Sequence, residues 1–344
     1  MALLPEWLAV RSPIFQAPMA GVQGSELAIA VSRAGGLGAL PCAMLSAEQI
    51  EAELLQIQAA KQPINLNFFC HTPPEPNAEA EQQWLQLLTP YFSELGLDPR
   101  SPLAAANRQP FNQHTADLVS AFKPEVVSFH FGLPAPDLLA QVKAAGCFIL
   151  SSATTVEEGL WLQANGADAV IAQGLEAGGH RGMFLTDQIS TQMGSFALVA
   201  QLVQALDAPV IAAGGIADAK GVKAALALGA SAVQIGTAYL LCTEAKTTAL
   251  HRQALKSEQA RHTALTNLFS GRPARGIVNR VMRELGCLNS KVPAFPLAGA
   301  AITALRQAAE ANGSSDFSPL WAGQNCSGCQ AISAFELTKQ LADF

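Results

Sequence analysis

The sequence is poor in charged residues, in aromatic residues and in long apolar runs. Only 14% of its 344 residues are charged, and a formal net charge of -6 gives no basic footprint for nucleic acid. No apolar run approaches the roughly 20 residues that cross a bilayer. Half of the residues are apolar, which is enough for a large core. We therefore expect a protein with no nucleic-acid or membrane partner, formed by about two domains or by one large barrel with an insertion.

Signs of export and of metal binding are also scarce. Residues 1–6 contain neither a charged n-region nor a long apolar segment, so we expect no signal peptide. Seven cysteines, an odd number scattered through a large chain, favour free thiols in a reducing cytoplasm. Cys326 and Cys329 form one Cys-x-x-Cys pair, but it has no second pair or histidines nearby. We expect no metal site, and we favour two ordinary thiols over a redox pair.

Eight short apolar runs predict buried parallel strands. They are residues 13–19, 36–41, 64–69, 126–131, 147–151, 169–173, 209–213 and 232–236. Helical patterns lie between most of them, as at 25–34, 46–60, 155–165 and 218–228. This alternation predicts a (β/α)8 TIM barrel, an α/β fold. An open doubly wound sheet is the alternative, but no Gly-x-Gly-x-x-Gly follows the first strand to support its dinucleotide-binding version.

Two segments are too long for plain connections between a strand and a helix. Residues 70–123 are rich in Pro, Asn and Gln, include a predicted helix at 78–88, and suggest a decorated loop or lid. Residues 243–318 look mostly helical, for example at 248–260. We therefore predict a barrel formed by residues 1–242 and 319–344, with a mainly helical lid domain, 243–318, inserted after the eighth strand.

The most informative stretch is residues 173–182, directly after the sixth predicted strand. Its four glycines, at positions 174, 178, 179 and 182, leave the backbone bare enough for a ligand to approach closely. His180, which titrates near neutrality, and Arg181 stand in the middle of it. Because the active site of such a barrel lies at the carboxyl ends of the strands, we interpret this loop as catalytic. A tight turn with a solvated His-Arg pair is the alternative.

The last two strand ends predict a phosphate site. Gly214 and Gly215 follow the seventh strand, and Gly236 and Thr237 follow the eighth, where barrels often bind phosphate through backbone N–H groups. Ordinary glycine capping of two helices is the alternative.

Three amide side chains in the strands suggest what carries this phosphate. Asn67, Gln173 and Gln234 are costly inside a barrel unless something pairs with them. A heteroaromatic ring with carbonyl and N–H edges would do so, and together with a phosphate it suggests FMN. Amides bonded to each other or to water are the alternative.

Six short motifs, in this order, resemble the nitronate monooxygenases, formerly called 2-nitropropane dioxygenases. They are Ala17-Pro18-Met19-Ala20-Gly21, Ala34-Gly35-Gly36-Leu37-Gly38, Phe129-His130-Phe131-Gly132, Glu176-Ala177-Gly178-Gly179-His180-Arg181-Gly182, Ala213-Gly214-Gly215-Ile216 and Gln234-Ile235-Gly236-Thr237. The resemblance covers most of the chain. It implies an FMN-containing barrel that oxidises alkyl nitronates with O2, within a class that acts on propionate 3-nitronate, a respiratory toxin.

The resemblance also implies roles for individual residues. His180 matches the catalytic histidine of the family, and His130 matches a second histidine in the pocket. It places Ala17, Pro18 and Met19 at the flavin ring, and Asn67 and Gln173 at the ring or the ribityl chain. By the same resemblance, Gly178 and Gly179 lie alongside the flavin, and Gly214, Gly215, Gly236 and Thr237 hold its phosphate. It also implies that Trp321 to Gln324 pack back near the flavin. With Gln234, these form the predicted cofactor site. Tyr91 and Tyr239 are the only tyrosines, which leaves little room for pocket tyrosines.

Charge suggests a mechanism. A nitronate is already a carbanion-like anion, so it needs no strong base. It would give one electron to oxidised FMN, leaving a nitroalkyl radical and an FMN semiquinone. Oxygen would take the flavin electron and combine with the radical, and the adduct would break to a carbonyl compound and nitrite. His180 would orient the nitronate or take the alpha proton of a neutral nitroalkane.

Two other functions stay open on this fold. One is an FMN-dependent NAD(P)H reductase of the enoyl-acyl-carrier-protein or quinone reductase type. The other is a non-catalytic flavin- or phosphate-binding barrel. Monomer and dimer are both compatible with the sequence.

Overall fold

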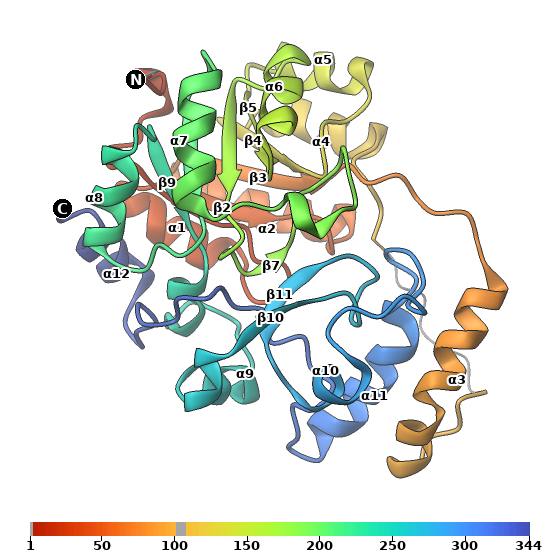
Figure 1. The fold of residues 1–344 in the computed structure, drawn as a ribbon. Helices are drawn as coiled ribbons and strands as arrows, with labels where there is room; N and C mark the ends of the chain where they lie inside the picture. Colours follow the sequence, from red (N-terminus) through yellow and green to blue (C-terminus); the bar gives the residue numbers. More distant parts are fainter. Residues whose placement is uncertain (1–2, 101–107) are drawn as a thin grey trace.

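Eight parallel strands form a barrel, which occupies the upper part of the molecule in Figure 1. The computed structural model describes residues 3–100 and 108–344. The strands are β1 (Ile14–Gln16), β2 (Gly38–Pro41), β3 (Ile64–Phe69), β4 (Val126–His130), β5 (Phe148–Ala153), β6 (Ala169–Gln173), β8 (Val210–Ala213) and β9 (Ala232–Ile235). They pair in the order β1-β9-β8-β6-β5-β4-β3-β2, and a parallel bridge between Phe15 and Leu37 joins β2 back to β1. The predicted (β/α)8 barrel and its eight strands are confirmed.

Helices cover the outside of this barrel. They are α1 (Ser25–Arg33), α2 (Ala47–Ala60), α4 (Gln113–Phe122), α5 (Pro136–Ala144), α6 (Val156–Ala164), α7 (Ser195–Ala205), α8 (Ala219–Ala227) and the C-terminal α12 (Ala334–Leu341). Local sequence sets their boundaries. Before α2, the Ser46 hydroxyl accepts from the Gln49 N–H and the Gln49 side chain accepts from the Ser46 N–H, which satisfies two backbone donors. The four predicted barrel helices are confirmed to within a residue or two at each end.

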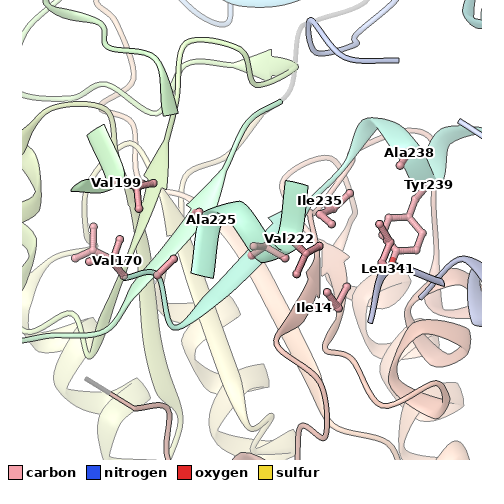
Figure 2. Close-up of a cluster of buried hydrophobic side chains, with 14 of the residues drawn as sticks. Ile14, Val170, Val199, Val222, Ala225, Ile235, Ala238, Tyr239 and Leu341 are labelled. Carbon is pink, nitrogen blue, oxygen red and sulfur yellow. The ribbon is translucent and has the colours of Figure 1, made fainter. Parts of the chain in front are cut away.

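The strands are apolar on both faces because both faces are buried. Ile14, Val170 and Ile235 point outward from their strands and pack against helix residues such as Val199 and Val222 (Figure 2). The residues that follow two of them, Phe15 and Ile171, pack inside the barrel with Leu37 and Ile211. Side chains that alternate between two buried layers give continuous apolar runs instead of the alternating pattern of a half-exposed sheet.

The long segment after β3 and the segment after β9 pack together into a second unit. It contains α3 (Ala78–Glu94), α9 (Ala249–Leu255), α10 (Arg280–Leu285) and α11 (Gly299–Ala311), and α3 lies beside α11 in Figure 1. Trp84 of α3 is 1% exposed, packs in the same cluster as Leu305, and donates its indole N–H to the Ala298 carbonyl at 3.2 Å. The helix predicted at 78–88 is therefore present, and it belongs to the core of the inserted unit.

The insertion is less purely helical than predicted. It contains an antiparallel hairpin of β10 (Thr263–Thr266) and β11 (Ala274–Ile277), which the sequence analysis missed. The edge of β11 pairs with the two-residue strand β7 (Gly179–His180) of the barrel loop, opposite Ala274 and Arg275. The insertion thereby holds the glycine-rich loop directly.

The remaining regular elements are short 3-10 helices. They are η1 (Glu6–Leu8), η2 (Ile189–Thr191), η3 (Thr237–Leu241) and η4 (Glu258–Arg261). Across the described residues, we find no helix with the length and apolar character needed to cross a membrane.

Candidate active site

A cavity of about 310 Å³ opens at the carboxyl ends of the barrel strands, beneath the insertion. This volume lies in the range of small-molecule sites. Fifteen predicted residues line it, namely Ala17, Pro18, Met19, Asn67, His130, Gln173, Gly178, Gly179, His180, Gly214, Gly215, Gln234, Gly236, Thr237 and Trp321. Gln324 is the exception. Its side chain is exposed, and its N–H donates to the Glu176 carbonyl at 2.9 Å, so it ties two loops together outside the cavity wall.

His180 stands at the junction of the barrel and the insertion. Its Nε2 lies 2.8 Å from the Ser270 hydroxyl, on the loop between β10 and β11. The rings of Phe295 and Trp321 each lie 5.6 Å from the imidazole. Among the described residues, no partner is found for Nδ1, which leaves that nitrogen for a ligand in the cavity. The sequence had identified His180, but Ser270, 90 positions away, could not be found from it.

The surroundings of His180 keep its imidazole neutral. Burial holds the pKa of His180 well below its usual 6.5, and the positive charges of Arg108 and Arg272 lower it further. An imidazole that is neutral at physiological pH can accept a proton, as a general base must.

His130, for which we predicted a catalytic role, lines the cavity with both ring nitrogens in contact with the protein. Its Nε2–H donates to the backbone carbonyl of His180 at 3.1 Å, and its Nδ1 lies 3.1 Å from the Ser152 hydroxyl. Burial lowers the pKa of His130 to about 4, so the ring is neutral and its Nδ1 accepts from Ser152. Both nitrogens are therefore engaged, and the Nε2 bond connects the ring of His130 to the backbone of His180.

The three amides predicted to face a heteroaromatic ring differ in what they contact. Gln173 donates to the His180 carbonyl at 2.9 Å and accepts from the Gly182 N–H at 2.7 Å, so it closes the loop on itself. The amide N–H of Asn67 donates to the Ser128 hydroxyl at 3.0 Å. Gln234 alone has a buried amide oxygen with no partner in the described chain. An amide oxygen left in this way on a cavity wall fits a ligand that donates a hydrogen bond.

Arg181 is neither solvated nor aimed at an anion. It is fully buried, and its guanidinium donates to the carbonyls of Gln173 and Gly174 at 2.6 and 2.7 Å and to the Gln192 side chain at 2.8 Å. Burial lowers the pKa of Arg181 to about 9, which leaves it protonated at neutral pH. Arg181 therefore fixes the base of the loop that carries His180, an outcome that neither sequence interpretation had given.

The loops after β8 and β9 form one end of the cavity. Gly214 and Gly215 have φ values of +111° and +75°, a conformation that glycine adopts without strain. Within the described residues, the backbone N–H groups of Gly215 and Gly236 make no hydrogen bond. The Thr237 hydroxyl, which we expected at a ligand, accepts from the Gly323 N–H at 2.9 Å. Free backbone donors in glycine loops could hold a phosphate group.

The other end of the cavity carries charges that the sequence analysis missed. Arg108 and Arg306 both line it, and the buried Nε of Arg306 has no hydrogen-bond partner in the described chain. Glu310, also in the lining, has its Oε1 4.0 Å from that nitrogen and 2.6 Å from the Ser318 hydroxyl donor. Burial and the charge of Arg306 lower the pKa of Arg108. Arg108 and Arg306 bring two positive charges and Glu310 one negative charge, so the three together leave a net positive charge.

The nitronate monooxygenase family model matches residues 2–343. The chain belongs to the nitronate monooxygenase family. It is 43% identical to a nitronate monooxygenase of Paraburkholderia phytofirmans, over 99% of this chain and 93% of that one. It is 42% identical to a nitronate monooxygenase of Pseudomonas aeruginosa, over 98% and 97% of the two chains.

Solved structures agree with this membership. A nitroalkane oxidase from Streptomyces ansochromogenes has a TM-score of 0.88 and is 36% identical, with 97% of this chain and 95% of that one covered. FabK from Thermotoga maritima has a TM-score of 0.70 at 23% identity, over 98% and 93% of the two chains, and this likeness shows the fold alone. As a member of this flavin-dependent family, the protein is an oxidoreductase. Neither Tyr91 nor Tyr239 lines its cavity.

Proposed function

We propose that this enzyme uses FMN and O2 to oxidise alkyl nitronates, and propionate 3-nitronate in particular, to a carbonyl compound and nitrite. We base this choice of substrate on the positive charge at one end of the cavity. Propionate 3-nitronate has two negative groups, a nitronate and a carboxylate. A cavity lined by His180, Arg108 and Arg306 offers a partner to each group.

The residues of the cavity fit FMN. The unpaired N–H groups of Gly215 and Gly236 would hold its phosphate, and the unpaired amide oxygen of Gln234 would accept from its ring or ribityl chain. The side chains of Pro18 and Met19 would lie against its ring. When bound, FMN supplies the electron-transfer chemistry that protein side chains cannot.

The protein itself would orient the substrate and handle its proton. The free Nδ1 of His180 would hydrogen-bond to a nitronate or accept the alpha proton of a neutral nitroalkane. Ser270 holds the ring from the opposite nitrogen at 2.8 Å, and His130 and Gln173 both donate to the His180 carbonyl. The base is thus fixed by three groups from three separate segments.

Two broader proposals accompany the reaction. The inserted unit, formed by residues 243–318 and α3, acts as the lid domain, because α9 and α11 supply the cavity wall opposite the barrel. The enzyme works in the cytoplasm, a reducing compartment in which its seven free cysteines persist as thiols.

The test is an anaerobic mix of the purified yellow protein with propionate 3-nitronate, followed by admission of O2. We expect bleaching of the flavin spectrum, and then oxygen uptake with release of nitrite. Mass spectrometry of the heat-released cofactor should give FMN and not FAD. Unchanged spectra with the nitronate, together with NADH oxidation in the presence of a quinone or an enoyl thioester, would replace this proposal by the reductase function.

A further inference from the structure

The segment 323–329, which we call the clasp, lies across the two glycine loops, after β8 and after β9, that line the cavity. The Gly323 N–H donates to the Thr237 hydroxyl, and the Asn325 side chain donates to the Gly215 carbonyl, each at 2.9 Å. A Cβ on Gly328 would overlap the backbone carbonyl of Ala217, so this part of the clasp packs directly on the loop after β8. The clasp therefore connects the two loops to each other.

The two cysteines of the clasp are placed at the ends of one turn. The Cys329 N–H donates to the Cys326 carbonyl at 3.1 Å, which closes a four-residue turn. The Cα atoms at the ends of such a turn lie within about 7 Å of each other, and disulfides span roughly 4.4–6.8 Å between Cα atoms. The turn thus brings the two cysteines to the separation that a disulfide needs. All seven cysteines of the chain are free thiols in the structure.

The two thiols differ in reactivity from each other and from the remaining five. When Cys326 is deprotonated, the Cys329 S–H turns to that thiolate, which lowers the pKa of Cys326, while the pKa of Cys329 is raised. Burial raises the pKa of the other five thiols, which are Cys42, Cys70, Cys147, Cys242 and Cys287. Since the thiolate is the reactive form, Cys326 is the favoured site of oxidation, and it is half-buried between the exposed residues Asn325 and Ser327.

We propose that Cys326 and Cys329 form a reversible disulfide that loosens the clasp over the cofactor's phosphate. A peroxide oxidises the Cys326 thiolate to a sulfenic acid and is itself reduced. The Cys329 thiol then attacks that sulfur, the S–S bond forms and water leaves. In sum, two thiols lose two electrons and two protons, and one peroxide becomes two waters. A dithiol reverses the change by exchange.

The link to the cofactor runs through Thr237 and rests on the proposed function. The Cys329 thiol donates to the Thr237 carbonyl at 3.1 Å, and Thr237 is also the residue to which Gly323 is bonded. A disulfide sulfur has no proton to donate, so oxidation removes the bond from Cys329 to Thr237. The loop after β9 then loses one of its two ties to the clasp.

The first measurement asks only whether the disulfide forms. Flavin-loaded protein is treated with hydrogen peroxide, the remaining thiols are alkylated, and tryptic peptides are weighed. The peptide 307–339 contains Cys326 and Cys329 and no other cysteine. We expect it to lose two hydrogens and resist alkylation before other cysteines react, and to recover both thiols with a dithiol reductant. Two alkylated thiols in this peptide while other cysteines oxidise would overturn the proposal. Protein without flavin still gives this result, so it is independent of the proposed function.

The second measurement follows the release of flavin fluorescence after dilution. Wild-type protein that contains the disulfide should release flavin roughly two- to tenfold faster than wild-type protein with both thiols, as expected for the loss of one hydrogen bond. Cys329→Ser keeps an O–H donor for Thr237 and cannot form the disulfide. Its rate of flavin release should therefore equal that of wild type with both thiols and should not change with peroxide. Cys287→Ser, another half-buried cysteine, should behave as wild type. Equal release rates before and after disulfide formation would refute the link to the cofactor.

Discussion

The reactivity of His180 is determined by its neighbours. One nitrogen is held by Ser270, its carbonyl is held by His130 and Gln173, and burial keeps the ring neutral. His180 lines the cavity, and its remaining nitrogen has no competing partner in the described chain. A residue that is positioned and kept deprotonated in this way is suited to taking a proton from carbon.

We predict that His180→Asn separates two kinds of substrate. A neutral nitroalkane must lose a carbon-bound proton, and loss of a general base should cost roughly a hundred- to ten-thousandfold in rate. A preformed nitronate skips that step and should lose only one charge-assisted hydrogen bond, about 1.5–3 kcal/mol. Oxygen uptake with both forms of one substrate is the measurement, and exposed His114→Asn is the control. Equal losses on both forms would assign His180 to binding alone.

The same residue predicts a pH profile. Only neutral imidazole accepts a proton, and the pKa of His180 lies well below 6.5. The rate on a neutral nitroalkane should therefore be flat from pH 8 to about pH 6.5, the ordinary value for histidine, and fall only in more acid solution. A rate that is still rising through pH 7 would contradict the neutral, buried state of His180.

Arg306 should determine the preference for a carboxylated substrate. Removal of its charge in Arg306→Met takes away a partner for the carboxylate of propionate 3-nitronate but not for the nitronate group. The loss of a hydrogen bond between charged groups predicts a rise in KM of roughly ten- to a hundredfold for propionate 3-nitronate and little change for 1-propyl nitronate. Arg261→Met removes a charge from an exposed position and serves as the control. A similar rise for both nitronates would place the carboxylate elsewhere.

At the scale of elements, close contact between backbones decides where the loops and helices sit. At Gly178, the loop after β6 touches the segment by which the chain returns from the insertion to the barrel. A Cβ on Gly178 would lie 2.6 Å from the carbonyl carbon of Ala322 and 2.6 Å from the Gly323 nitrogen. Backbone atoms cannot rotate away as the end of a flexible side chain can, so one of the two segments would have to shift.

Gly178→Ala should consequently damage the site more than the fold. We expect a loss of about 1–3 kcal/mol in the free energy of unfolding, typical of overpacking, with a clear drop in bound flavin. Flavin content per chain and urea denaturation measure the two effects. In Gly221→Ala the new Cβ meets no atom closer than 3.4 Å, so this helix α8 variant is the matched control. Full flavin content in Gly178→Ala would mean that the loop after β6 and the segment at Ala322 and Gly323 can move apart without loss of flavin binding.

Gly38 permits close backbone contact between a helix and a strand, as Gly178 does between two loop segments. A Cβ on Gly38 of β2 would overlap the backbone of Ala28 in α1, so the helix packs against bare strand backbone. We predict that Gly38→Ala pushes α1 away from the barrel and lowers the free energy of unfolding by about 3 kcal/mol, the upper end for overpacking. Urea denaturation beside Gly221→Ala tests this. A loss below 0.5 kcal/mol, ordinary for a surface change, would show that α1 adjusts easily.

At the scale of the whole molecule, buried histidines link stability to pH. Burial lowers the pKa values of His71, His130 and His251 to about 4, compared with about 6.5 in an unfolded chain. Between these values the unfolded state binds more protons than the folded state. Stability is therefore complete above about pH 6.5 and declines as the pH falls toward 4.

We predict that each such histidine contributes up to about 1.4 kcal/mol per pH unit to this decline. His251→Gln should reduce the slope by about that amount between pH 6 and 5, where the unfolded imidazole is mostly protonated and the folded one is not. His114→Gln, at an exposed position, should leave the slope unchanged. Denaturant titrations at fixed pH values provide the slopes. The same slope in wild type and His251→Gln would show that His251 is protonated equally in both states.

The sequence by itself determined the barrel and most of the cavity wall. Strands buried on both faces must be continuous apolar runs, and helices between them carry local start and stop signals, so both are visible in short windows. Parallel strands place their carboxyl ends at one edge of the sheet, so residues at six separate strand ends could be predicted to meet. His180 and the glycine loops were found for this reason.

Tertiary structure alone decided what each polar group contacts. Ser270 reaches His180 from the insertion, Arg181 turns inward to three acceptors, and Arg306 faces the cavity from a helix of the lid. The edge of the hairpin β10–β11 pairs with β7, more than 80 residues earlier in the chain. Hydrogen bonds and ion pairs act over a few ångströms between segments far apart in sequence. No local pattern records them, so the hydrogen bonds of His130 and His180 could be read only from the folded chain.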